Sequence, residues 1–182
     1  KRKNLIARKK AKKNKFTFKD LKILNFYTKF KSIIFKNIKY KSFALAVSGG
    51  SDSLCLAYFT KIYATEFGNK VHVLIVDHNL RKQSHQEALK VKTILGKRKI
   101  LSKILRWKGK VPKSNIQKNA RDMRYTMLSN YCMKNKIQYL ITAHHGDDQI
   151  ENFFIRLIRG SGLTGLSSMS TNAKYSNQLK II

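Results

Sequence analysis

The stretch FALAVSGGSDS, residues 43–53, decides the fold, because a short apolar run is followed at once by small polar residues. Five consecutive apolar residues predict a strand that is buried on both faces. The paired glycines Gly49 and Gly50 allow a tight turn and a close approach to an anion, and the start of the next helix presents unpaired N–H groups. The stretch therefore predicts a strand, a phosphate-binding loop and a helix.

This loop differs from the common nucleotide-binding fingerprints. The chain contains neither GxxxxGK[ST] nor a GxGxxG followed by an acidic residue about 20 positions later. An ordinary strand-to-helix turn with a capping serine or aspartate would have a similar composition. Taken alone, the loop leaves both interpretations open. Its candidate phosphate-binding residues are Ser48, Gly49, Gly50, Ser51, Asp52 and Ser53.

The apolar pattern around this loop predicts alternating strands and helices. The predicted strands are 43–47, 71–76, 104–107 and 137–143, and the predicted helices are 16–38, 52–66, 84–97 and 114–135. Such a succession favours right-handed crossovers and a doubly wound α/β fold, a mainly parallel sheet with helices on both faces. The predicted inward stripe of the last helix is Ile116, Ala120, Met123, Met127 and Tyr131.

The charge of the chain favours a polyanionic partner. The sequence has 39 Lys and Arg against 9 Asp and Glu, a formal net charge of +30. Clustered cations attract RNA phosphates and release counterions. An AT-rich genome, which enriches Lys, Ile and Asn together, would give a similar composition without any binding role, so this alternative stays open.

The sequence predicts a protein of the cytoplasm, with no membrane segment. It has no run of 18 apolar residues, and its first 15 residues lack the apolar region of a secretory signal. A basic start without acids also fits a targeting segment for an organelle matrix or stroma. Cys55 and Cys132 are isolated in predicted helices, which favours small buried thiols over a disulfide or zinc site.

Polar residues follow three of the predicted strands, in segments 48–53, 77–81 and 144–151. The carboxyl ends of parallel strands meet at one edge of a sheet, where ligands bind. Asp147, Asp148 and Glu151 gather in the first turn of a helix that begins after the last strand. Helix capping explains one or two of these acids. Carboxylates at a phosphate site also suit Mg²⁺, or accept a proton from an amine.

With these residues in view, the chain resembles the PP-loop (N-type) ATP pyrophosphatase family and, within it, the tRNA(Ile)-lysidine synthetases. The matching segments are SGGSDS at 48–53, VDHNLR at 76–81, NARDMRY at 119–125, HHGDDQIE at 144–151 and RGSGLTGL at 159–166. Together they span roughly residues 40–170. SGGSDS indicates only the wider family, whereas the last two segments favour the lysidine-forming branch.

The resemblance implies a reaction that uses ATP, Mg²⁺, free L-lysine and the CAU-anticodon isoleucine tRNA. ATP would adenylate the C2 carbonyl oxygen of the wobble cytidine and release pyrophosphate. The side-chain amine of lysine would then displace AMP. The resemblance also implies carboxyl-terminal domains that grip the tRNA, and the chain ends at Ile182, soon after the last segment. We therefore expect either a fragment or a reduced form.

The resemblance also assigns roles to single residues. Residues 48–53 would hold the ATP phosphates, with Asp77 and His78 near the adenosine or the loop. The implied metal ligands are Asp52, Asp147 and Asp148. The implied catalytic residues are Asp52, His144, Asp147, Asp148 and Glu151. The implied contacts to AMP, the activated base or tRNA are Arg81, Arg121, Arg124, Arg159 and Gly160. A solvated helix face remains an alternative for Arg121 and Arg124, and a flexible exit from the domain remains one for 159–166.

The expected organisation has three parts. Residues 1–15 form a basic arm, 16–170 form the PP-loop catalytic domain, and 171–182 form a tail or the start of a carboxyl-terminal region. Two other functions remain open. A tRNA thiolation enzyme of the same fold would need a cysteine pair or a persulfide carrier near the loop, for which Cys55 and Cys132 are poorly placed. A non-catalytic RNA-binding remnant would keep only the charge.

Overall fold

The computed structural model describes residues 20–109, 114–143, 174–176 and 179–182. Several predicted features lie outside these residues. They are the arm 1–15, the segments 144–151 and 159–166, and with them His144, Asp147, Asp148, Glu151, Arg159 and Gly160.

The described strands form one mainly parallel sheet, in the order β3-β2-β1-β4-β6-β5. Their bounds are β1 Phe43–Val47, β2 Val71–Asp77, β3 Ser102–Arg106, β4 Tyr139–Thr142, β5 Lys174–Ser176 and β6 Leu179–Ile181. All neighbouring pairs are parallel except β5 and β6, which pair antiparallel at the edge. The described helices are α2 Leu21–Ile38, α3 Ser51–Phe67, α4 Ser84–Lys97 and α5 Ile116–Lys134.

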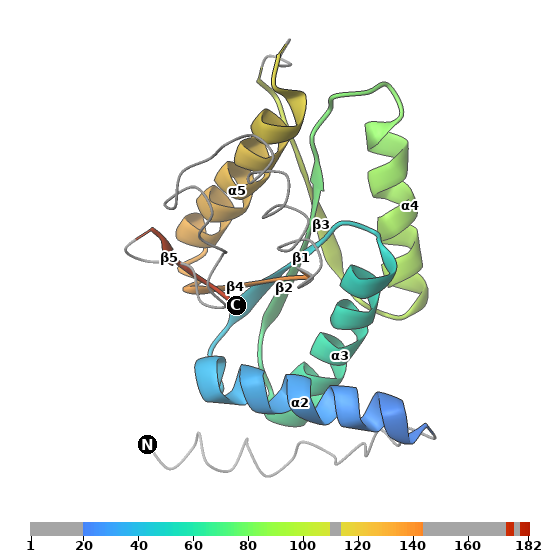
Figure 1. Ribbon diagram of the computed structural model, residues 1–182, viewed down its shortest axis with the longest axis vertical. Helices are drawn as coiled ribbons and strands as arrows, with labels where there is room; N and C mark the ends of the chain where they lie inside the picture. Colours follow the sequence, from blue (N-terminus) through green and yellow to red (C-terminus); the bar gives the residue numbers. More distant parts are fainter. Residues whose placement is uncertain (1–19, 110–113, 144–173, 177–178) are drawn as a thin grey trace, which may run out of the picture.

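The helices cover both faces of the sheet, as Figure 1 shows, with α5 on one side and α3 and α4 on the other. This arrangement confirms the predicted doubly wound α/β fold. The helix 84–97 has the predicted bounds. The first described helix begins later than predicted, at Leu21, because Asp20 accepts a hydrogen bond from the Lys22 amide at 2.7 Å and caps it.

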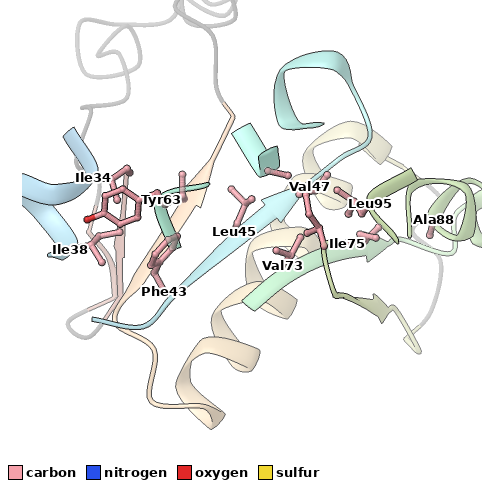
Figure 2. Packing of buried hydrophobic residues seen from close by; sticks show 13 residues of the cluster. Ile34, Ile38, Phe43, Leu45, Val47, Tyr63, Val73, Ile75, Ala88 and Leu95 are labelled. Atoms are coloured by element: carbon pink, nitrogen blue, oxygen red, sulfur yellow. The ribbon is translucent and has the colours of Figure 1, made fainter. Parts of the chain in front are cut away.

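Strand β1 divides the core into two layers because successive side chains point to opposite faces. Phe43, Leu45 and Val47 lie in the cluster that includes residues of α2, α3 and α4. Figure 2 shows Leu45 and Val47 beside Val73 and Ile75 of β2 in this layer. Ala44 faces the other way, into the cluster that includes Leu128 and Cys132 of α5. Burial on both faces explains why β1 is apolar throughout.

The predicted inward stripe of α5 is wrong in its phase. Met123 is buried, but Ile116 is 53% exposed, and the other buried apolar residues of the helix are Tyr125, Leu128 and Cys132. Tyr131 is only partly buried: it packs against the core cluster of α5, and its hydroxyl lies 3.0 Å from Nδ1 of His72 on β2. Amphipathic residues such as Tyr suit a rim position as well as a core position, which made the prediction ambiguous.

The two cysteines lie in different surroundings. Cys132 is fully buried, as predicted, and its burial raises the pKa of the thiol to about 11. Cys55 is exposed, so the prediction of a buried thiol is wrong there.

Strand β6 extends the sheet beside β4, and the amide of Ile182 donates to the carbonyl of Leu140 at 2.9 Å. No strand was predicted in the segment 171–182. The boundary at residue 170 stays a prediction, but part of the segment beyond it belongs to this sheet. None of the described helices combines the length and the apolar character that crossing a membrane requires.

Two features require a glycine at position 49, its backbone conformation and the close packing of a neighbouring side chain. Its φ of 98° lies in the region that L side chains rarely adopt. A Cβ at this position would lie 2.5 Å from Cγ2 of Val91 on α4. Gly49 is therefore also the point where α4 packs against the loop after β1.

We expect Gly49→Ala to lower the free energy of unfolding by about 2 kcal/mol, through backbone strain and overpacking. Gly50→Ala is the matched control, because its Cβ would meet only Ser48 Oγ at 3.9 Å. Gly50→Ala should lower the free energy of unfolding by less than about 1 kcal/mol. Urea denaturation of both variants measures the difference. Equal destabilisation would contradict the role assigned to the contact with Val91.

Candidate functional site

A pocket of about 340 Å³ lies at the carboxyl ends of β1, β2 and β4, with residues of α4 and α5 in its walls. The strand order reverses between β1 and β4, because β2 and β3 extend the sheet on one side and β4 on the other. Such a switch point is where open α/β sheets bind ligands. The predicted site residues that line the pocket are Ser48, Ser53, Asp77, His78, Arg81 and Arg124.

The loop after β1 is held in shape by Ser53, which is only 3% exposed. Its Oγ accepts from the amide of Gly49 at 3.1 Å and donates to the carbonyl of Gly50 at 2.9 Å. Ser48 Oγ lies 3.3 Å from the same oxygen. Ser53 thus closes a small ring of hydrogen bonds that turns the chain from β1 into α3.

Helix α3 begins at this loop with Gly50 at its N-cap, so no side chain caps its first turn. The unpaired first-turn N–H groups and the helix dipole favour an anion at this end. Ser51 and Asp52 are exposed in the first turn, and neither lines the pocket described above. This geometry suits the phosphate role predicted for residues 48–53.

Asp77 ends β2, and its side chain has no exposed surface. Oδ1 accepts from the amide of Asn79 at 2.9 Å. Oδ2 lies 3.1 Å from Nδ1 of His85 and 3.5 Å from Nε of Arg106. The carboxylate oxygens are therefore engaged by groups of the protein itself, while the residue lines the pocket. The predicted place of Asp77 near the adenosine or the loop stays a prediction.

His78, in the loop after β2, and Arg124, on helix α5, both line the pocket. Burial lowers the pKa of His78, and the nearby positive charge of Arg124 lowers this pKa further. His78 is therefore neutral at pH 7. Its buried Nε2 has no hydrogen-bond partner among the described residues. A neutral imidazole nitrogen in a pocket is suited to a hydrogen bond with an uncharged ligand group.

The other predicted arginines are differently placed. Arg81 is 74% exposed and lies 3.1 Å from Glu87, an acid of α4 that also lines the pocket. Arg121 lies over the ring of Tyr125 at 5.7 Å and does not line the pocket. Of the two arginines on α5, only Arg124 is thus placed to meet a ligand in this pocket.

Sequence reasoning missed His85, Glu87 and Arg106. Arg106 ends β3, so the rule that strand ends gather at one edge could have indicated it. His85 and Glu87 lie in the first turn of α4, which follows the loop after β2. The sequence could have indicated these two residues, because the predicted helix 84–97 begins close after the end of the predicted strand 71–76.

The described residues contain no group of three or more His, Cys, Asp or Glu that could hold a metal ion. Of the predicted metal ligands, Asp52 is described and exposed, whereas Asp147 and Asp148 lie outside the described residues. The Mg²⁺ site therefore stays a prediction, because it needs Asp52 together with Asp147 and Asp148.

We expect Arg124→Gln to raise the pKa of His78 towards its ordinary value of about 6.5, because one of the charges that oppose protonation is lost. Arg121→Gln, one turn earlier on α5, is the control with the same charge change. NMR titration of the imidazole Cε1 proton measures both. Equal shifts in the two variants would show that overall charge, and not the pocket, sets this pKa.

Comparison with known proteins supports the family resemblance of the motifs. A family model described as a PP-loop domain matches residues 23–182. A tRNA(Ile)-lysidine synthase of Orientia tsutsugamushi (strain Boryong) is 46% identical over 76% of this chain and 31% of its own length. One of Rickettsia akari (strain Hartford) is 42% identical over 80% of this chain and 34% of its own length. The chain thus spans about a third of these relatives.

A solved structure shows a similar fold. It is the U34-tRNA thiolase NcsA from Methanococcus maripaludis with its [4Fe-4S] cluster, at a TM-score of 0.67 and 19% identity, covering 87% of this chain and 59% of that one. At this identity the likeness concerns the fold alone. The resemblance stated from the motifs is confirmed by the match over residues 23–182 and by the identities of 46% and 42%. This chain belongs to the PP-loop domain family.

Proposed function

We propose that this chain is the ATP-dependent part of an enzyme that ligates L-lysine to C2 of the wobble cytidine in the CAU-anticodon isoleucine tRNA. The observation that carries the proposal is the 46% identity to a tRNA(Ile)-lysidine synthase over 76% of the chain. The proposed activity is that of a whole enzyme, and the aligned segments make up only 31% and 34% of the two relatives.

The described pocket fits the nucleotide part of this reaction. Membership of the PP-loop family implies the use of ATP. The uncapped start of α3 and the bare backbone of Gly49 and Gly50 suit the phosphates. The cavity between the ends of β1, β2 and β4 lies beside this loop, because Ser48 and Ser53 belong to both. The base and ribose are proposed to lie there, near His78.

The proposed chemistry has two steps. The C2 carbonyl oxygen of cytidine attacks the α-phosphorus of ATP, and the bond to the β-phosphate oxygen breaks, so pyrophosphate leaves. The lysine amine then attacks C2, and the C2–O bond breaks, so AMP leaves with the oxygen. Activation is needed because a carbonyl oxygen is a poor leaving group, and the amine, with a reference pKa of about 10.4, must first lose a proton.

The acidic residues are proposed to serve the lysine and the metal. Asp52, Asp147 and Asp148 would hold Mg²⁺, which neutralises phosphate charge when bound. The set His144, Asp147, Asp148 and Glu151 would bind the ammonium group and accept its proton. Arg81, Arg124, Arg159 and Gly160 are proposed to contact AMP, the activated base or tRNA, and Arg121 to contact tRNA from outside the pocket.

The net charge of +30 supports an RNA partner. We propose that the protein acts where its tRNA is found, in a bacterial cytosol or an organelle matrix. A thiolation enzyme of the same fold is the second candidate, because the solved thiolase shares the fold. Cys132 argues against it, since burial keeps this residue a neutral thiol. Cys55 is exposed but single.

The direct test incubates the full-length protein with ATP, Mg²⁺, labelled lysine and the CAU-anticodon isoleucine tRNA. We expect label in the tRNA at the wobble cytidine by nucleoside analysis, and one AMP released per lysine incorporated. A Cys55→Ser, Cys132→Ala variant should retain this activity, whereas a thiolation enzyme would lose its own. Retention of tRNA without any release of pyrophosphate would favour the RNA-binding remnant.

We expect Asp52→Ala to reduce AMP formation by about 100-fold or more, because charge placed at the phosphates acts mainly in the transition state. Binding of tRNA, measured by filter retention, should be nearly unchanged. Asp122→Ala is the matched control, since Asp122 is an exposed acid of α5 that does not line the pocket. Unchanged turnover in Asp52→Ala would refute the assignment of this residue.

A further inference from the structure

The loop after β2, residues 78–81, is held at its base by one buried carboxylate. Asp77 is 2% exposed as a whole residue, and its two oxygens meet three different groups of the protein. An ionised carboxylate in such a place must be paired and hydrogen-bonded, because its desolvation is costly. The arrangement therefore ties the carboxylate to specific partners on β3 and α4.

Arg106 holds the loop at two points. Its Nε lies 3.5 Å from Oδ2 of Asp77, and its Nη2 donates to Oδ1 of Asn79 at 3.0 Å. A guanidinium can make both contacts at once because its donors lie in a rigid fork. The parallel register places Arg106 directly beside Asp77. Arg106 thus clamps the residues on either side of His78.

Asn79 has a backbone conformation that needs such support. Its φ is 52°, in the left-handed region that is unusual for residues other than glycine. The carboxylate of Asp77 accepts its amide hydrogen, and Arg106 binds its side chain. Further along the loop, the amide of Arg81 donates to Oγ of Ser84 at 3.1 Å. These contacts fix the path of the backbone that carries His78 into the pocket.

We infer that Asp77, His85 and Arg106 are positioning residues for the nucleotide pocket. They act through the loop by holding His78. The buried Asp77 carboxylate is the counter-charge of Arg106 and a hydrogen-bond partner of His85, and it does not contact the nucleotide. This inference rests on the proposed function in one respect, that a nucleotide binds in the pocket that His78 lines. His85 and Arg106 are half exposed, at 41% and 50% of their side chains, so replacing them leaves the core intact.

The test compares Arg106→Gln and Arg106→Lys with Lys108→Gln in the full-length protein. Lys108 is an exposed cation two residues further on and provides the same loss of charge. Binding of a non-hydrolysable ATP analogue is measured by calorimetry. We expect Arg106→Gln to weaken it about tenfold, as loss of outer-shell support does. Arg106→Lys should recover part of this affinity, and Lys108→Gln should bind as the natural chain does.

Hydrogen exchange at two amides separates positioning from a general loss of stability. The Asn79 amide donates to the Asp77 side chain, whereas the Trp107 amide donates to the Asp77 backbone carbonyl at 2.9 Å. In Arg106→Gln and in Asp77→Asn the Asn79 amide should exchange about tenfold faster, while the Trp107 amide stays protected because the strands still pair. The double variant Arg106→Gln, Asp77→Asn should bind the analogue no more weakly than the weaker-binding single variant. The reason is that each single change already breaks the same contact, the one between Arg106 and Asp77.

Three results would overturn the inference. They are equal affinities of Arg106→Gln and Lys108→Gln for the analogue, an Asn79 amide whose exchange is unchanged, and loss of protection at Asn79 and Trp107 together. If the natural chain fails to bind the analogue, the proposed function fails. The exchange rates then still decide whether Arg106 holds the loop.

Discussion

Pairing of β1 on both of its edges is the constraint on which the rest of the structure depends. The strand pairs in parallel with β2 on one side and with β4 on the other. The register places Val47 beside Ile75 and Ala46 beside Thr142, so the three strands reach the same edge of the sheet together. Because parallel strands must be covered on both faces, this pairing also requires the helical layers.

The pocket follows from where this pairing ends. Just beyond the paired residues, the chain leaves β1 through Ser48, β2 through His78 and β4 through Ala143, and all three line the cavity. The helices contribute as well, since Val91 of α4 contacts the space that a Cβ on Gly49 would fill. The loop after β1 therefore depends on core packing as well as on its own hydrogen bonds.

Charge has two separate roles in this chain. The excess of lysine and arginine favours association with a polyanion. The scarce acids act locally. Glu66 pairs with Lys31 between α3 and α2 at 2.7 Å, Glu87 pairs with Arg81, and Asp77 is buried among its partners. In a chain of net charge +30, a buried carboxylate is a specific anchor for nearby cations.

The sequence alone determined the alternation of strands and helices and the position of the glycine turn after β1. These features depend on local periodicity and on residues a few positions apart, such as the five apolar residues of β1 and the glycines that follow. It also indicated that Ser48 and His78 would meet, because the carboxyl ends of parallel strands converge at one edge. Arg124 was indicated only by the family resemblance. The family resemblance rested on these segments and also on 144–151 and 159–166, which favoured the lysidine-forming branch.

The tertiary structure decided which side chains contact one another. The partners of Asp77 come from α4 and β3, so they depend on the register of β2 against β3 and on side-chain rotamers, which no local pattern encodes. The phase of α5 was likewise ambiguous in the sequence. Several amphipathic residues could face inward, and only packing against Leu74 and Leu140 of the sheet selected Leu128 and Cys132.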